Sequence, residues 1–183
     1  MMKTLSLSEV KMKLSQFVEE VHDTTNPISV TRNGQSVAVL MSQELYDGWK
    51  ETLYVMKDPK FLESVLRGIH LLDRGEGISL TASELLENRS GGDSKRQQPV
   101  RIKIHPDTKN VITDFHPQIQ SKMFESLQGI SKQESGTLLR DRLDGLALIQ
   151  VGDYRIIYRW RMHAIEIIAV DVRETAYQGT VNT

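Results

Sequence analysis

The stretch VGDYRIIYRWRMHAIEIIAVDVRETAY, residues 151–177, decides how the second half of the chain folds. Successive side chains of a β-strand point to opposite faces, so this stretch predicts one face of aromatic and aliphatic residues and one basic face. The basic face carries Arg155, Arg159 and Arg161. It is either the solvated side of an antiparallel sheet, which is common, or a surface that binds a polyanion.

The residues before this stretch predict the rest of a second domain. Residues 100–104, VRIKI, alternate in the same way and form its first strand. Two helices follow, separated at His116-Pro117, and the apolar residues of the second lie at helical spacing: Ile119, Met123, Leu127 and Ile130. A strand, two helices and an antiparallel sheet make residues 100–183 an α+β domain.

A linker separates this domain from the first half of the chain. Residues 88–99, NRSGGDSKRQQP, contain no residue able to anchor in a core. Residues 42–87 carry five Lys/Arg against nine Asp/Glu, a net charge of −4, whereas residues 88–183 carry fourteen against eleven, a net charge of +3. Chance can produce such a contrast, but it also suits an acidic cover on a basic surface.

The first half predicts a small α+β unit followed by helices. A strand at Leu5 and Leu7 precedes a helix capped by Ser8, and ISVTRNGQSVAVLM forms a hairpin around Asn33-Gly34, which suits a type I′ turn. Further helices begin at Ser42, at Asp58-Pro59 and at Thr81, which forms a capping box with Glu84. The helix after Pro59 has an apolar stripe that must be buried: Phe61, Leu62, Val65, Leu66, Ile69 and Leu72.

Composition narrows the class of protein. The 183 residues include no cysteine, which excludes disulfides and thiolate metal sites, and the five histidines are scattered singly. We therefore expect no cofactor and no metal. No apolar segment is long enough to cross a membrane and no secretory signal is recognisable, so a cytoplasmic protein is expected.

The two halves resemble the two partners of a type II toxin–antitoxin pair. Residues 1–87 resemble the Phd/YefM antitoxin family through LSLSEVKMKLSQFVEEV, PISVTRNGQSVAVLMSQELYDGW and LYVMKDPKFLESVLRGIHLLDRGEGISL. Residues 100–183 resemble the RelE/ParE toxin superfamily through LDGLALIQVGDYRIIYRW and IIAVDVRETAY. The order predicts a fused pair with a dimerisation domain at 1–55, a toxin-neutralising segment at 56–87, the linker and a toxin domain.

The resemblance to the antitoxin family implies that residues 1–55 bind operator DNA as a homodimer or higher oligomer. By position, its DNA contacts correspond to Lys11 early in the first helix and to Thr31, Arg32 and Asn33 in the hairpin. Without the family, these residues would be interpreted as solvated surface and a turn. The stripe from Phe61 to Leu72 is then expected to cover the toxin.

The resemblance to the toxin superfamily implies a ribosome-dependent messenger RNA endoribonuclease. Arg155, Arg173 and Tyr177 match its catalytic positions, and arginine suits the charge of the cleaved phosphate. Leu146 and Leu148 stand where well-studied members have two lysines. Either Lys103, Arg159, Arg161 or Arg101 substitutes as an RNA contact, or the domain cuts poorly, or its target is gyrase, as in the ParE branch.

Two functions from different classes follow. The chain is a self-neutralised enzyme that acts on ribosomes and messenger RNA once freed, or a DNA-binding autoregulator whose toxin domain is inactive. In the first case we expect the arginines to be offset by acidic residues of the cover, which mimic phosphates. The candidates are Glu63, Asp73, Glu76, Glu84 and Glu87.

Overall fold

The computed structural model describes residues 2–85, 101–130, 136–161 and 164–172 of the chain. It contains two compact units, Met1–Thr52 and Leu53–Thr183. The boundary falls three residues before the one expected at 55. The second unit therefore joins the expected cover segment to the C-terminal sheet in one compact body.

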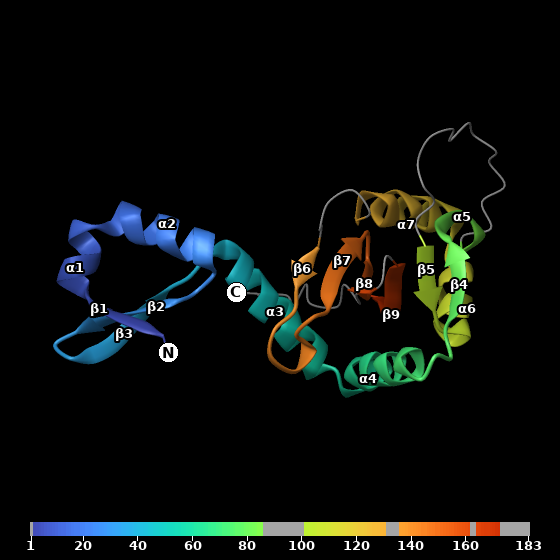
Figure 1. Ribbon diagram of the computed structural model, residues 1–183, viewed down its shortest axis with the longest axis horizontal. Coiled ribbons are helices and arrows are strands. Elements are labelled where there is room, and N and C mark those ends of the chain that lie inside the picture. The colour runs from blue at the N-terminus through green and yellow to red at the C-terminus, as the bar shows by residue number, and fades with distance from the viewer. Residues whose placement is uncertain (1, 86–100, 131–135, 162–163, 173–183) are drawn as a thin grey trace, which may run out of the picture. The chain divides into compact units, whose positions relative to one another are not determined.

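The N-terminal unit is a three-stranded sheet with two short helices (Figure 1). Its strands are β1 (Lys3–Ser6), β2 (Ile28–Arg32) and β3 (Gln35–Leu40), with β1 parallel and β3 antiparallel to the central β2. Its helices are α1 (Leu7–Met12) and α2 (Leu14–Thr24), and α3 (Gln43–Lys57) begins in this unit. The core consists of Val10, Phe17, Val21, Ile28 and Val30.

Local sequence chemistry explains these elements, with one correction. The helix expected from Ser8 is two helices, because Lys13 between them has φ −129° and ψ 30°. The cap is Ser6, whose hydroxyl accepts from the Glu9 amide while the Glu9 carboxylate accepts from the Ser6 amide. The predicted hairpin is confirmed, since Asn33 and Gly34 both have positive φ, as a type I′ turn requires.

The second unit is built on a six-stranded sheet in the order β4-β5-β9-β8-β7-β6. The strands are β4 (Ile78–Thr81), β5 (Arg101–Ile104), β6 (Thr137–Leu138), β7 (Ala147–Val151), β8 (Tyr154–Arg161) and β9 (Ala164–Val172). Its helices are α4 (Pro59–Asp73), α5 (Ala82–Leu85), α6 (Pro106–Thr113) and α7 (Pro117–Ile130), with a 3-10 turn η1 at Asp141–Leu143.

The α+β class is confirmed, and the sheet differs from the expected one in two respects. Sequence analysis missed β4, which pairs antiparallel with β5 and so adds a strand from the first half of the chain. The sheet is also mixed, because β5 runs parallel to β9. The expected capping box at Thr81 and Glu84 begins α5 directly after β4.

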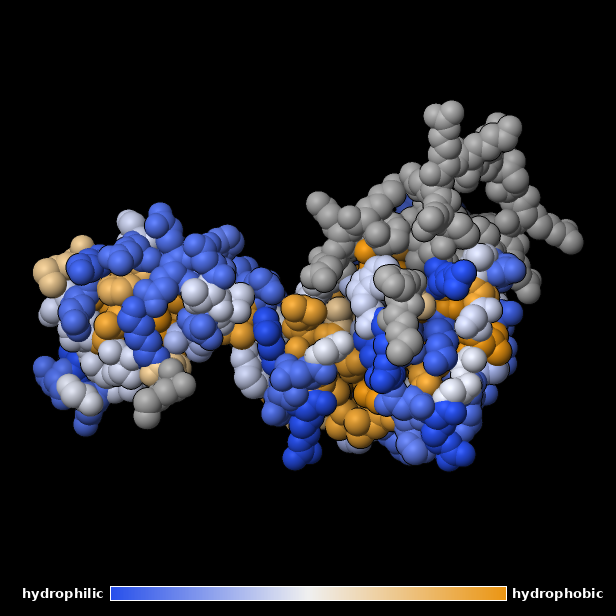
Figure 2. All heavy atoms as spheres, viewed as in Figure 1, coloured by the Kyte–Doolittle hydropathy of each residue, from blue (hydrophilic) through white to orange (hydrophobic). Residues whose placement is uncertain are grey.

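Helices cover both faces of this sheet, and Figure 1 shows α4 and α7 on opposite sides. The face towards α6 and α7 packs through an apolar cluster that includes Ile112, Met123, Leu127, Ile156 and Tyr158. The face towards α4 packs through a second cluster: Val55, Phe61, Val65, Leu72, Leu139, Leu143, Leu146, Leu148, Ile157, Ile168 and Ala169. Figure 2 shows hydrophobic residues gathered where α4 meets the sheet, with hydrophilic residues around them.

A glycine in the middle of α4 sets the distance between the helix and the sheet. A Cβ atom at Gly68 would collide with the carbonyl oxygen of Ile168 in β9. Ile168 lies where the pairing of β8 with β9 shifts register, so the strand bulges towards the helix. Glycine is unfavourable inside a helix, and this close approach explains its presence here.

Candidate functional site

The basic face of β8 is the face that α4 covers. Arg155, Arg159 and Arg161 alternate with Ile156, Tyr158 and Trp160, as the period of two predicted. The interpretation of this face as the solvated side of the sheet is wrong for most of its length, because Arg155 is 2% exposed and Ile157 is fully buried in the cluster with α4. Arg161, at the far end of β8, is exposed. We call the surface formed by Arg155, Arg159, Arg161 and Lys103 the arginine face.

Arg155 lies beneath the last turns of α3. The centre of its guanidinium lies 3.4 Å from the ring centroid of Tyr54, a cation–π arrangement. The Tyr54 hydroxyl donates a 3.5 Å hydrogen bond to Asp171 Oδ2. Asp171 is the partner of Arg155 across the β8–β9 ladder, so the three side chains form one group.

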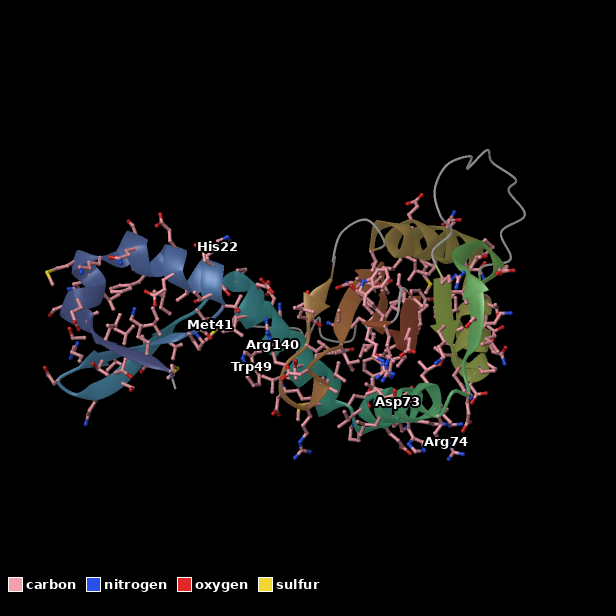
Figure 3. All side chains as sticks on the ribbon, viewed as in Figure 1. His22, Met41, Trp49, Asp73, Arg74 and Arg140 are labelled. Atoms are coloured by element: carbon pink, nitrogen blue, oxygen red, sulfur yellow. The ribbon has the colours of Figure 1, made fainter. Side chains whose placement is uncertain are left out.

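Asp73, the last residue of α4, neutralises the other end of the arginine face. Its Oδ1 accepts from Arg159 Nη2 at 2.6 Å and from Arg161 Nη1. The hydrogen bonds from Arg159 and then Arg161 hold the pKa of Asp73 below its ordinary value. In Figure 3 Asp73 lies at the end of α4 towards the sheet, and its neighbour Arg74 lies on the outer side.

Glu166 of β9 supplies a second acidic partner, from within the sheet. It is 3% exposed, accepts from Arg159 Nε at 2.6 Å, and lies 3.4 Å from Lys103 Nζ. Lys103 also donates to the Leu72 carbonyl oxygen at the end of α4. Beside this charged cluster is a pocket lined by Gly75, Thr81, Glu84, Arg101, Lys103 and Arg161.

Of the acidic residues expected to offset the arginines, Asp73 alone has a described contact with them. Glu84 binds the backbone and hydroxyl of Thr81, and Glu76 pairs with Arg74. Glu63 is exposed on α4, and Glu87 lies outside the described residues. Sequence reasoning missed Tyr54 and Glu166, because an aromatic residue near a helix end and an acidic residue in a strand carry no distinctive motif.

The stripe of α4 meets the sheet with one exception. Phe61, Val65 and Leu72 are buried in the α4-side cluster, and Leu62 and Ile69 are partly buried against it. Leu66 is 51% exposed, so its expected burial is wrong. Leu146 and Leu148 are buried in the same cluster, beneath α4.

Of the remaining predicted site residues, two fall outside the described residues and four lie in the N-terminal unit. Arg173 and Tyr177 lie outside the described residues, so their expected position beside Arg155 is not part of the described site. Lys11 is exposed on α1, and Arg32 and Asn33 are exposed at the hairpin of the N-terminal unit. Thr31 is half-buried, and its hydroxyl donates to the Leu5 carbonyl oxygen, which ties β2 to β1.

Neither described unit has the features of a metal centre or a membrane span. Among residues 2–85, 101–130, 136–161 and 164–172, no three histidine, aspartate or glutamate side chains are grouped to hold a metal ion. Within the same residues no helix has the length and apolarity needed to cross a bilayer.

Comparison with known proteins identifies the class of the first half. Residues 2–75 match the family model of the antitoxin Phd_YefM of type II toxin–antitoxin systems. Antitoxin RelF of Mycobacterium tuberculosis is 38% identical over 64 residues, which cover 35% of this chain and 69% of that antitoxin. Antitoxin YefM of Escherichia coli K12 is 31% identical over 86 residues, which cover 47% of this chain and all of that antitoxin.

A solved structure gives a similar match. A chain of the toxin–antitoxin complex RelBE2 of M. tuberculosis is 33% identical, with a TM-score of 0.38, over 41% of this chain and 82% of that chain. By the sequence relatives, the chain belongs to the Phd/YefM family of type II antitoxins. The matched region extends to residue 75 and so includes Tyr54, all of α4 and Asp73.

Proposed function

We propose that this chain is an antitoxin fused to its own toxin, in which α3 and α4 neutralise the C-terminal domain. One observation carries the proposal: a helix inside the region that matches the antitoxin family packs on the C-terminal sheet and places Asp73 on two of its arginines. The likeness of residues 100–183 to RelE/ParE toxins is the second half of the proposal.

The proposed activity of the freed domain is cleavage of messenger RNA on the ribosome. Attack of a ribose 2′-hydroxyl on the neighbouring phosphate needs a proton acceptor and positive charge around the phosphate. Arg155, Arg173 and Tyr177 are the proposed catalytic residues, and Lys103, Arg159 and Arg161 the proposed RNA contacts. In the intact chain Arg155 lies beneath Tyr54, and Arg159 and Arg161 are paired with Asp73, so this chemistry is blocked.

The N-terminal unit is proposed to bind operator DNA as a dimer, and so to regulate its own transcription. The support is geometric. The type I′ turn presents Arg32 and Asn33 at the tip of an exposed hairpin, and Lys11 is exposed on α1. Basic side chains at exposed positions of this kind make the phosphate contacts that orient a protein on DNA.

A specific observation favours a second candidate. Leu146 and Leu148 occupy positions where the ribonucleases of the superfamily have lysines, and both are buried under α4. A domain without these basic groups is either inactive, which leaves an autoregulator, or acts on a protein target such as gyrase. In both alternatives α3 and α4 still cover the C-terminal domain. Only the activity of the freed domain differs.

The test is to express residues 100–183 in bacteria alone and together with residues 1–87. A nuclease predicts growth arrest and codon-positioned cuts in messenger RNA, both abolished by Arg155→Ala and both suppressed by residues 1–87. Growth arrest with intact messenger RNA and stalled gyrase supports the gyrase branch. Normal growth, with the fragment detected in the soluble fraction, supports the autoregulator.

A further inference from the structure

The contact of Tyr54 with Arg155 has the geometry of a protein site for a nucleobase. The tyrosine ring lies on the guanidinium at 3.4 Å, and its hydroxyl, at the edge of the ring, donates to Asp171. A planar ring stacked on an arginine, with a donor at the ring edge facing an acceptor, is also how unstacked bases are held in single-stranded RNA recognition.

The two protein groups fit a particular kind of base. Arginine guanidinium is planar and stacks on aromatic faces, which an ammonium group cannot do. A carboxylate accepts from an exocyclic amino group, as in the contact of acidic side chains with N4 of cytosine. Uracil has a carbonyl oxygen at that position, which a carboxylate repels. The site therefore favours cytosine over uracil.

We propose that Arg155 and Asp171 form a nucleobase site of the C-terminal domain, and that Tyr54 occupies this site in the intact chain in place of a base. The inference rests on the proposed function, because it assigns a subsite to the RNA-binding surface. It changes the role of Arg155, which holds a base beside the phosphate contacts instead of contacting only a phosphate.

The spacing along β8 agrees with a strand of RNA on this face. Arg159 lies four positions after Arg155 along β8, which at about 3.3 Å per residue is roughly 13 Å. That distance exceeds the roughly 3.4 Å between successive nucleotides of one strand in a duplex, so more than one nucleotide lies between the two arginines. On this proposal the antitoxin region mimics the RNA with two side chains. Tyr54 takes the place of a base, and Asp73 takes the place of a phosphate further along the RNA.

The experiment uses the full chain in two matched variants that both contain Asp73→Asn, which loosens the contact with Arg159 and Arg161. One adds Tyr54→Ala, which uncovers the face of Arg155, and the other adds Tyr54→Phe, which keeps the ring. Binding is measured by fluorescence anisotropy with three short labelled RNAs of equal charge. They contain cytidine, uridine or abasic ribose.

With Tyr54→Ala we expect the cytidine RNA to bind about tenfold more tightly than the abasic RNA, in line with the usual contribution of stacking, and more tightly than the uridine RNA. With Tyr54→Phe the three RNAs should bind equally, through phosphates alone. If Tyr54→Ala melts below the assay temperature, Tyr54→Val fills more of the space and allows the same comparison.

The failures of the two proposals are distinguishable. Equal binding of all three RNAs to both variants overturns the nucleobase site and leaves the polyanion site of the proposed function intact. Binding of none of the RNAs to either folded variant overturns both. A preference for cytidine that is the same in both variants also overturns the inference, because the base is then held away from Arg155.

Discussion

A side chain at Gly68 would collide with the carbonyl oxygen of Ile168, so α4 and β9 approach more closely than any other residue allows. This contact holds the antitoxin-family helix on the C-terminal sheet, and it places Val65 and Leu72 in the apolar cluster. The close approach therefore helps to hold α4 on the sheet, where Asp73 at its end pairs with Arg159 and Arg161.

Gly68→Ala should weaken the packing of α4 against the sheet. The added methyl group must push the helix away from β9, and overpacking of this kind costs about 1–3 kcal/mol. Chemical denaturation of the full chain measures the loss. Gly129→Ala in α7 is the matched control, because no atom lies within 4 Å of a Cβ placed there, and replacement of a helical glycine should stabilise by up to about 1 kcal/mol.

A second prediction compares neighbouring residues of α4. Val65 is fully buried and Leu66 is 51% exposed. Val65→Ala should cost roughly 1.5–3 kcal/mol, through lost burial and the cavity that remains, whereas Leu66→Ala should change stability by less than about 0.5 kcal/mol. Equal losses at the two positions in denaturation experiments would show that α4 has a different face towards the sheet.

An element of this fold can be predicted from the sequence when residues close to it in the chain determine it. The turn at Asn33-Gly34 and the capping box at Thr81 were predictable, because a few neighbouring residues determine them. The strand β4 was not, because ISLT is too short to show a period and becomes a strand only by pairing with β5, more than twenty residues later. Lys13 likewise gives no local signal for the break between α1 and α2.

The candidate site was predictable only where it depends on local sequence. The alternation of β8 placed Arg155, Arg159 and Arg161 on one face, and the charge contrast pointed to an acidic cover that includes Asp73. Which residues meet across the cover was not predictable. Tyr54 reaches Arg155 over a separation of about a hundred residues, and only packing brings the two together.

The ion pairs of Asp73 predict a dependence of stability on pH. The pKa of Asp73 is lowered in the folded state, so its contribution is complete above the unfolded pKa of about 3.9 and is lost as the pH falls through the lower folded value. Asp73 is 45% exposed, so the contribution at neutral pH should be about 1 kcal/mol or less. Asp73→Asn should remove it.

Denaturation of wild type and Asp73→Asn at several pH values checks this. The wild type should be the more stable at neutral pH, and the two curves should converge in acid. High salt should also reduce the difference, because exposed ion pairs are screened. A difference that persists unchanged in acid would mean that the effect of Asp73 does not depend on its charge.

The last prediction concerns the N-terminal unit. Arg32 is exposed beside the Asn33-Gly34 turn, where a phosphate contact releases counterions from DNA on binding. Arg32→Ala should weaken binding of the full chain to its upstream DNA and reduce the slope of log affinity against log salt concentration by about 1.

The control is Lys122→Ala, which removes an exposed charge from α7 of the second unit and should leave both quantities unchanged. Anisotropy titrations at four or more salt concentrations, roughly spanning 50–200 mM, give the slope. If Arg32→Ala and Lys122→Ala lower the affinity equally, the hairpin is not the DNA contact, and binding depends only on the overall charge of the chain.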